Sequence, residues 1–384
     1  MTLMATATPR LMAGIPTLNA GLYRRIRFLV GDPVALLEMS PSESILILRD
    51  IEMQRAKQSA RVTQVACPRD YAPEGGLSGD RETATAQATA ECLRRHGAHQ
   101  VTVDRSLPMI FAEMVRRAGI EVICDTEWGI LERRQKDEQE IAWIQKAQSI
   151  TEEVMELACR MVARADVGND GELLVQGSPL TSERLMRQID LWLLERGYSN
   201  PGSIVAGGTV GADCHDHGHG ALRTGEPVIV DIYPRDKQTL YNGDCTRTVV
   251  HGTIPPRVAQ MHAAVVAAKA AATRAVRAGV TGEEVHLATI RSIESSGFQM
   301  GLPTDSSPKS FTSMTHGTGH GLGLEVHEPP LLDRGGPALL VGDVITIEPG
   351  LYSPEVGGVR VEDMVVVTKD GCINLNKLPE GLAW

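Results

Sequence analysis

Four acidic residues lie in or beside short segments rich in Val, Ile, Thr and Tyr, a composition typical of β-strands. They are Asp231 in VIVDIY, Asp244 in DCTRTVV, Glu348 in VITIEPGLY and Glu362 in VRVEDMVVV. A buried carboxylate is costly unless a cation neutralises it. An ion pair explains any single one of these acids equally well, and Arg247 and Arg360 are near enough in sequence to supply two. Four acids in four such segments favour a metal site instead.

A glycine-rich segment, HGTGHGLGLEVHEPP, adds three imidazoles at His316, His320 and His327. Its glycines would let the backbone pack close to a site. The segment lacks the lysine and the strand–helix context of a phosphate-binding loop, which excludes a nucleotide site of that kind. One histidine joined to the four carboxylates would instead form a set of metal ligands.

The charge of this set predicts how many ions it binds. Four carboxylates carry four negative charges, which two divalent cations neutralise and one does not. Oxygen ligands with a single imidazole suit Mn²⁺ best, with Co²⁺, Zn²⁺ or Fe²⁺ as alternatives. Two such ions about 3.5–4 Å apart would activate water and polarise a carbonyl group. The chemistry expected of the site is therefore hydrolysis of an amide bond.

The chain of 384 residues is long enough for two domains with separate cores. Residues 1–135 alternate short apolar runs, expected to be buried strands, with helical stretches, which predicts an α/β domain. The expected strands are RFLV (27–30), ILIL (45–48), VTV (101–103) and EVIC (121–124), and the expected helices are 81–96 and 108–118.

The second domain is expected to span residues 136–384. A charged stretch that begins at Leu131 leads into apolar residues that recur every three or four positions, which predicts an amphipathic helix at the start of this domain. Three more helices are expected at 182–196, 257–278 and 282–297, and the acid-bearing segments are expected to be strands.

The composition excludes some partners. The net charge is −10 and only 4% of residues are aromatic, so neither nucleic acid nor an anionic membrane is an expected partner. The seven cysteines are scattered without a CxxC pair, as in reduced cytoplasmic proteins. The first 21 residues lack an unbroken apolar core, so no signal peptide is expected. Charged residues interrupt the Ala-rich stretch 263–280, which argues against a membrane span.

The order of the candidate ligands, within the phrases GHGLGLEVHEPP, TIEPGLY and GVRVED, resembles the pita-bread metallopeptidases. That family includes aminopeptidase P, prolidase and methionine aminopeptidase, with creatinase as a metal-free relative. The resemblance covers roughly residues 135–375 and implies an α+β pita-bread catalytic domain. Residues 1–135 are similar, by position and α/β pattern, to the creatinase-like N-terminal domain.

The resemblance implies a role for each of the five ligands. Asp231 would chelate the first metal, and Asp244 and Glu362 would bridge both metals. His320 and Glu348 would complete the second metal. Glu348, beside the bridging water, would also be catalytic, as the group that passes a proton to the leaving nitrogen.

Four further residues match positions around the substrate of this family. His215, in GADCHDHG, matches a catalytic histidine that hydrogen-bonds near the scissile peptide and helps to move protons. His316 and His327 match histidines that line the substrate pocket and orient the scissile carbonyl, and His327 would also help to hold the developing oxyanion. Arg360 matches an arginine of the closing motif and is expected to contact substrate.

Two features depart from the family pattern. The family commonly has a glycine two residues after the first aspartate, where this sequence has Tyr233. Asp231 and Asp244 are 13 positions apart, slightly more than is common, and a longer hairpin turn absorbs this difference at small entropic cost. The stretch CHDHGHG also offers three histidines where the family needs one. We choose His215 and expect His217 and His219 to be solvated loop residues.

The resemblance implies an enzyme that removes the N-terminal residue of a short peptide, with proline expected in second position. Methionine aminopeptidases generally lack a large N-terminal domain, so residues 1–135 favour the aminopeptidase P or prolidase type, between which the sequence does not choose. Two alternatives stay open. One is creatinase-like, non-peptidase chemistry, and the other is a non-catalytic binding protein. A homodimer is the family-level expectation.

Overall fold

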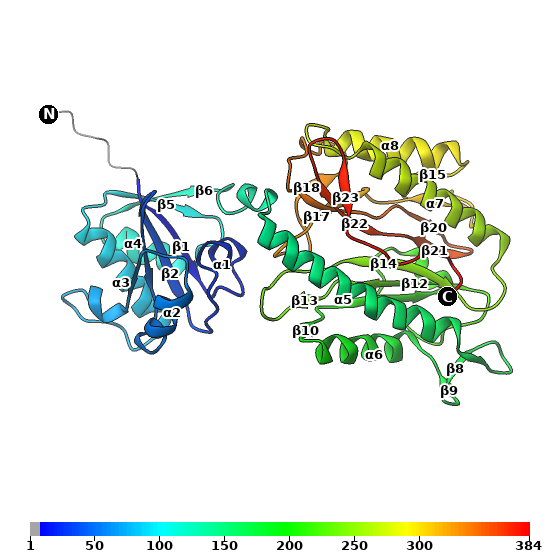
Figure 1. The fold of residues 1–384 in the computed structure, drawn as a ribbon, viewed down its shortest axis with the longest axis horizontal. Coiled ribbons are helices and arrows are strands. Elements are labelled where there is room, and N and C mark those ends of the chain that lie inside the picture. Colours follow the sequence, from blue (N-terminus) through cyan, green and yellow to red (C-terminus); the bar gives the residue numbers. More distant parts are fainter. Residues whose placement is uncertain (1–7) are drawn as a thin grey trace. The chain divides into compact units, whose positions relative to one another are not determined.

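The computed structural model describes residues 8–384, and the chain divides into two compact units, Met1–Arg133 and Arg134–Trp384 (Figure 1). Residues 1–7, part of the stretch in which no signal peptide is expected, lie outside the described residues. Within residues 8–384, no helix combines the length and the apolar character needed to cross a membrane.

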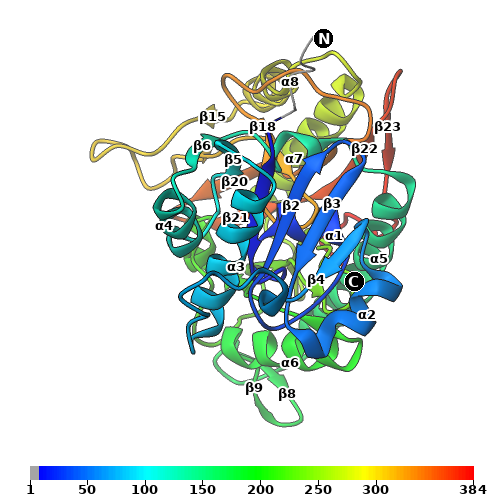
Figure 2. The same cartoon turned by 90° about the vertical axis from the view of Figure 1, so that its left-hand side faces the viewer.

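The first unit is a six-stranded sheet with helices on both faces. Alternate residues of β1 (Arg10–Gly14) point to opposite faces. Leu11 and Ala13 join the hydrophobic cluster of α3 and α4, whereas Met12 joins that of α1 and α2. The strand order is β4-β3-β2-β1-β5-β6, and Figure 2 shows β2, β3 and β4 side by side. The other elements are β2 (Val34–Ser40), β3 (Glu43–Ile47), β4 (Gln64–Ala66), β5 (Gln100–Asp104), β6 (Glu121–Asp125), α1 (Ala20–Ile26), α2 (Met53–Ser59), α3 (Arg81–Arg95) and α4 (Met109–Arg117).

Two expected strands of this unit differ from the structure. The prediction of a strand at 27–30 was wrong, because Arg27 ends α1 in the left-handed conformation (φ 48°) and the residues after it are irregular. Phe28 and Val30 are buried all the same, since an irregular segment can bury side chains as a strand does. The run 121–124 does form β6, but β6 is the edge strand and most of it is exposed rather than buried.

Four long helices belong to the second unit: α5 (Glu138–Ala163), α6 (Ser182–Glu195), α7 (Pro256–Ala275) and α8 (Gly282–Ser295). Reciprocal capping boxes start two of them, with Asp137 and Glu140 at α5 and Thr281 and Glu284 at α8. Leu131 belongs to a separate 3-10 turn, Leu131–Arg134, so the charged stretch before α5 is not part of the helix.

Three sheets of the second unit carry the candidate ligands. Figure 1 shows strands between α5 and α6 on one side and α7 and α8 on the other. The sheet orders are β11-β12-β14, β15-β16-β20-β21 and β18-β17-β19-β22-β23. Their strands are β11 (Ser203–Gly207), β12 (Pro227–Ile232), β14 (Cys245–Val250), β15 (Gln299–Met300), β16 (Ser313–Met314), β17 (Gly319–Gly321), β18 (Glu328–Leu332), β19 (Val344–Ile347), β20 (Gly350–Ser353), β21 (Gly357–Arg360), β22 (Asp363–Val367) and β23 (Cys372–Asn374).

Two of the acid-bearing segments are not single strands. VITIEPGLY forms β19 and β20, with Glu348 between them, and VRVEDMVVV is split at Glu362, which follows β21 and precedes β22. Only Asp231 lies inside a strand, whereas Asp244 comes directly before β14. The acids therefore stand mostly at strand ends. The remaining short strands are β7 (Asp166–Val167), β8 (Leu173–Val175), β9 (Ser178–Pro179), β10 (Tyr198–Ser199) and β13 (Arg235–Asp236).

Candidate metal centre

The pairing of β12 with β14 puts both aspartates on one face of a sheet. Antiparallel register sets Asp231 opposite Thr246, and Asp244 lies two residues before Thr246, so its side chain points to the same face. Gln148 on α5 fixes the Asp244 backbone. Its side-chain amide donates to the Asp244 carbonyl at 2.7 Å, and its Oε1 accepts from the Asp244 N–H at 2.8 Å.

A second pair of strands brings the two glutamates together. β19 and β22 pair antiparallel with Ile347 opposite Asp363. Glu348, which follows Ile347, therefore lies across from Glu362, which precedes Asp363. The Glu362 N–H donates to the Thr246 carbonyl at 3.1 Å, and the Thr246 hydroxyl donates to Glu362 Oε2 at 2.9 Å. These two bonds join the glutamate segment to the strand that follows Asp244.

His320 enters the same space from β17. Its Nδ1 lies 3.2 Å from the Gly321 carbonyl, to which it donates, so the Nε2 lone pair faces the acids. Nε2 lies 3.5 Å from Glu348 Oε1 and 3.9 Å from Asp244 Oδ2. Burial, and next the neighbouring His327, lower the pKa of His320 to about 4. The ring is therefore neutral near pH 7, as a metal ligand must be.

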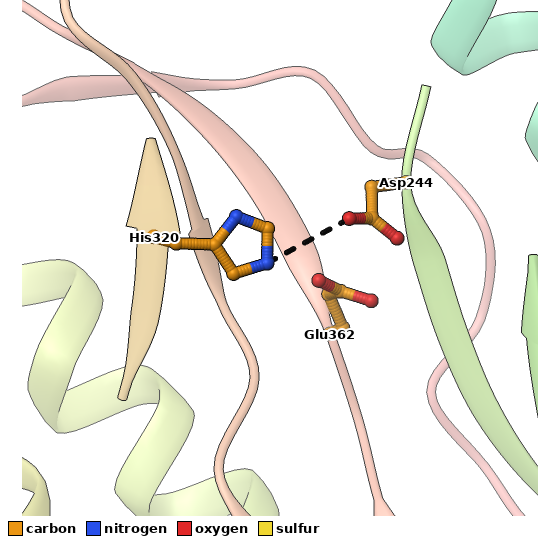
Figure 3. Close-up of side chains that lie close together, drawn as sticks. All are labelled: Asp244, His320 and Glu362. Atoms are coloured by element: carbon orange, nitrogen blue, oxygen red, sulfur yellow. Dashed lines mark ion pairs between the residues drawn. The ribbon is translucent and has the colours of Figure 1, made fainter. Parts of the chain in front are cut away.

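Three of the predicted ligands form a compact cluster. One donor atom each from Asp244, His320 and Glu362 lies within 4.8 Å of the others, and all three residues are buried. Figure 3 shows these side chains pointing toward one another from three separate segments, with the ion pair between His320 and Asp244 marked.

All nine predicted site residues line one cavity of about 530 Å³ in the second unit. The nine are His215, Asp231, Asp244, His316, His320, His327, Glu348, Arg360 and Glu362. His217 and His219, expected to be solvated, are exposed and lie outside this lining, and His217 Nδ1 is 3.0 Å from the Ser203 carbonyl. The cavity contains groups separated by more than 140 positions in the sequence.

Burial and neighbouring negative charges favour the protonated form of Asp244, Glu362 and Glu348. Burial, and then the charge of Glu362, raise the pKa of Asp244 well above its usual value. Burial, and then the charge of Glu348, do the same to the pKa of Glu362. Burial raises the pKa of Glu348 to about 7, against the opposing effect of Arg360. Like charges in a poorly solvated space favour the neutral acids unless a cation is present.

The donor set fits divalent cations. Asp231 Oδ1 is buried without a hydrogen-bond partner among the described residues, a costly state for a carboxylate oxygen. Arg360 is the sole Lys or Arg in the described lining of the cavity, and its single charge cannot balance four carboxylates. Asp231, Asp244, His320, Glu348 and Glu362 together provide oxygen and imidazole donors of the kind that Mn²⁺, Co²⁺, Zn²⁺ and Fe²⁺ accept.

Hydrogen bonds to neighbouring residues hold the Arg360 guanidinium in place. Arg360 is 3% exposed. Its Nη2 donates to Asp231 Oδ2 at 2.7 Å and its Nη1 donates to the Tyr352 hydroxyl at 2.9 Å. Of the four acids for which an ion pair with an arginine was an alternative to metal binding, Asp231 is therefore one that does pair with an arginine. Arg247 pairs with a different acid, Asp363, at 2.9 Å. Arg360 both positions Asp231 and lines the cavity.

His316 continues the network from Arg360. The Tyr352 hydroxyl accepts from Arg360 and lies 2.7 Å from His316 Nε2, to which it donates, while Nδ1 lies 2.8 Å from the Gly317 carbonyl. Burial, and then the charge of Arg360, lower the pKa of His316 to about 4. Both ring nitrogens are occupied, so His316 presents a neutral ring to the cavity.

The side chains of His327 and His215 are more exposed than those of His316 and His320. His327 is exposed, and its ring contacts that of His320 edge-on, with centroids 4.3 Å apart. His215 is exposed in the loop after the 3-10 turn Gly208–Ala212, and its backbone N–H donates to Asp213 Oδ1 at 2.9 Å. These positions leave both rings accessible to a molecule in the cavity.

Three further residues have no role in the sequence-based site: Tyr233 and Asp333 line the cavity, and Tyr352 contacts two residues that line it. Tyr352 joins His316 to Arg360, Tyr233 occupies the position of a common family glycine, and Asp333 follows β18. Tyr352 stands in the phrase TIEPGLY, and its alternation along β20 could have indicated it. No local pattern marks Asp333 as a residue of the cavity, because its position depends on how the β18 segment folds back.

The chain combines an α/β unit with a second unit of sheets flanked by helices. The second unit has a buried centre of acids and one histidine. Such a centre is typical of metal-dependent hydrolases, the class that the fold and the site indicate for this chain. Its residues 142–369 match the family described as "Metallopeptidase family M24". The chain belongs to metallopeptidase family M24.

The chain is similar to curated peptidases. It is 36% identical over 215 residues to "Probable dipeptidase PepE" of Mycobacterium tuberculosis, a match that covers 55% of this chain and 53% of that protein. The match thus spans about half the length of that relative. It is 28% identical over 287 residues to "Xaa-Pro dipeptidase" of Pyrococcus horikoshii, covering 73% of this chain and 74% of the relative.

Solved structures confirm the fold. The prolidase from Pyrococcus horikoshii OT3 superposes with a TM-score of 0.76 at 23% identity, covering 98% of this chain and 95% of that one. The X-Pro aminopeptidase from Thermotoga maritima MSB8 superposes with a TM-score of 0.79 at 22% identity, covering 98% and 97%. The predicted combination of an α/β N-terminal domain with an α+β pita-bread domain is confirmed.

Proposed function

We propose that this chain is a metal-dependent exopeptidase that removes the N-terminal residue of short peptides with proline in second position. One observation carries the proposal: five side chains of metal-ligand type line a single cavity of about 530 Å³, a volume suited to a small ligand. The relatives named as dipeptidase and Xaa-Pro dipeptidase support a peptide substrate.

Asp231, Asp244, His320, Glu348 and Glu362 are the proposed ligands of two divalent ions, Mn²⁺ first, with Co²⁺, Zn²⁺ or Fe²⁺ as alternatives. When bound, such ions supply an activated water and polarise the scissile carbonyl. The chain's own contribution is to hold the ligands in position before the ions arrive. Gln148 fixes the backbone at Asp244, and Thr246 holds Glu362.

Proton movement is proposed for Glu348. Its carboxyl lies 3.5 Å from His320 Nε2 and opens to the cavity. A carboxylate at this place can accept a proton from the attacking water and return it. Glu348 would pass a proton to the leaving nitrogen.

The exposed histidines are proposed to hold the substrate. His327, whose ring lies against that of His320, would donate to the oxygen of the scissile carbonyl, where negative charge develops. His215 lies on the same cavity and would hydrogen-bond near the scissile peptide. His316, with both nitrogens engaged, would exclude water from one wall and steady Arg360 through Tyr352.

The test is release of the N-terminal residue from matched Xaa-Pro and Xaa-Pro-Yaa peptides, with added Mn²⁺ and after chelation. We expect cleavage that disappears with chelator and returns with Mn²⁺. The preferred length separates a prolidase type from an aminopeptidase P type. Asp244→Asn is the matched inactive variant, and Asp305→Asn, an exposed acid outside the cavity lining, is the control.

Absence of cleavage of either peptide by metal-loaded protein would overturn the proposed activity. In that case metal binding by the wild-type chain, but not by Asp244→Asn, would still support the metal centre. The search would then move to other carbon–nitrogen bonds.

A further inference from the structure

One acid of the cavity lies outside the proposed ligand set. Asp333 follows β18, and its side chain is 49% exposed. It lines the same cavity as the metal-ligand residues, together with its neighbours Gly317 and Leu331. A carboxylate that is neither buried nor a ligand, yet faces a substrate-sized space, is available to a bound molecule.

The surrounding residues fix the position of this carboxylate. The backbone N–H of Arg334 donates to Asp333 Oδ1 at 2.7 Å, and His286 Nε2 lies 3.4 Å from the same oxygen. His286 is 4% exposed, and its Nδ1 lies 2.9 Å from the Thr318 hydroxyl. A side chain anchored at one oxygen in this way loses little further freedom when a ligand binds the other.

The opposite oxygen is left accessible by a glycine. A Cβ at Gly317 would lie 3.2 Å from Asp333 Oδ2, closer than an ordinary van der Waals contact. Gly317 and Asp333 both line the cavity. The absence of a side chain at 317 therefore keeps the face of the carboxylate open on the cavity side.

Arg334, the cation next to Asp333 in sequence, is exposed to solvent and lies outside the cavity lining. Arg360, the cation in the lining, is paired with Asp231 at 2.7 Å. Burial lowers the pKa of His286, so this neighbour is neutral near pH 7. Once the ligand acids are neutralised by bound cations, Asp333 remains as a negative charge on the wall. Such a wall attracts a positive group of the substrate and repels a negative one.

We propose that Asp333 is a specificity-determining residue that selects peptides carrying a basic side chain, Lys or Arg, beside the scissile bond. The proposal rests on the proposed peptidase function and adds the substrate class. The carboxylate pairs with the ammonium or guanidinium group of the substrate, and a glutamate at the same substrate position is disfavoured by like charge.

The test compares kcat/KM for three tripeptides, Leu-Pro-Leu, Lys-Pro-Leu and Glu-Pro-Leu, with the Mn²⁺-loaded enzyme, because the N-terminal side chain is the variable one beside the scissile bond. We expect Lys-Pro-Leu to be preferred over Leu-Pro-Leu by about two- to fivefold, the range that a partly exposed ion pair supplies. The preference should lie in KM rather than kcat and should weaken with added salt. Asp333→Asn should bring the ratio close to one.

Two further variants keep the result interpretable. Asp333→Lys should reverse the order, so that Glu-Pro-Leu is favoured over Lys-Pro-Leu, which a misfolded protein cannot produce. Glu283→Gln is the matched control, because Glu283 is an exposed acid near His286 that lies outside the cavity lining. This control should keep the wild-type ratio.

Equal rates for all peptides with the wild-type enzyme, or a lysine preference that survives in Asp333→Asn, would overturn the proposal. If the metal-loaded protein cleaves no peptide, calorimetry still measures the ratio of the peptide affinities. A failure of the proposed peptidase activity can thus be distinguished from a failure of the proposed role of Asp333. In that case no peptide is cleaved, while the binding ratio and its loss in Asp333→Asn still decide the role of Asp333.

Discussion

At the scale of single residues, Glu348, a proposed metal ligand, should couple metal binding to pH. Its pKa is about 7, raised from the usual 4.5 mainly by burial. Below that pH the carboxyl is protonated, and a cation must displace the proton in order to bind. His320, with a pKa of about 4, is already neutral and adds no proton of its own near pH 6.

We therefore expect the affinity for Mn²⁺ to rise with pH through the neutral range, because Glu348, together with Asp244 and Glu362, whose pKa values are also raised, must lose its proton on binding. Titration calorimetry in buffers of different ionisation enthalpy measures both the affinity and the protons released. Glu348→Gln should reduce the slope. An affinity for Mn²⁺ that does not change over this pH range would contradict the assignment of Glu348 as a ligand.

Arg360 makes a second prediction at this scale. One guanidinium spans Asp231 and the Tyr352 hydroxyl through two different nitrogens, which a lysine ammonium cannot match. Arg360→Lys should keep the charge but let Asp231 move, and so weaken Mn²⁺ binding by about 10- to 100-fold. Arg257→Lys, outside the cavity lining, is the control. Normal metal affinity with a raised KM would instead assign Arg360 to substrate binding alone.

At the scale of elements, strand register positions the ligands and buried ion pairs hold the segments around them. Lys136, just before α5, contacts Glu328 of β18 at 2.6 Å, and both side chains are 1% exposed. This pair anchors β18 between His327 and Asp333, the two residues that flank it in the cavity lining. Lys146 on α5 offers a comparison, because its contact with Asp236 is 3.9 Å long and its side chain is 62% exposed.

Lys136→Met should lower the free energy of unfolding by about 3–5 kcal/mol, because it removes one partner of a buried ion pair. Lys146→Met should change it by less than about 1 kcal/mol. Urea unfolding monitored by circular dichroism measures both values. Equal effects of the two substitutions would show that burial of the Lys136 pair does not matter to stability.

At the scale of the whole molecule, the two units should respond differently to metal. All five proposed ligands belong to Arg134–Trp384, whereas Met1–Arg133 has hydrophobic clusters of its own. Metal at about 100 times its Kd stabilises the unit that binds it by about 2.7 kcal/mol.

Scanning calorimetry with and without Mn²⁺ should therefore show one transition that moves to higher temperature and one that stays. The moving transition should be insensitive to Mn²⁺ in Asp244→Asn. A single transition that shifts as a whole would mean that the two units unfold together, and the expectation of independent units would then be abandoned.

The sequence by itself determined the features that depend on local pattern. The helix expected at 282–297 matches α8 (Gly282–Ser295) to within a few residues, because a helix is stabilised by contacts three and four positions apart. The order of Asp231, Asp244, His320, Glu348 and Glu362 within short phrases indicated the family and the ligand set. The same local approach was wrong at 27–30, where an apolar run is buried without being a strand.

Only the tertiary structure decided which groups meet. Arg360 pairs with Asp231, which is 129 positions away, whereas Arg247 pairs with Asp363 instead. Asp333 lines the cavity because of the way the segment after β18 packs against Gly317 and α8. Strand register and side-chain packing between distant segments set these contacts, and neither leaves a periodic signal in the sequence. The residue types of the proposed metal centre are therefore visible in the sequence, whereas the ion pairs around it and the place of Asp333 in the cavity lining arise only on folding.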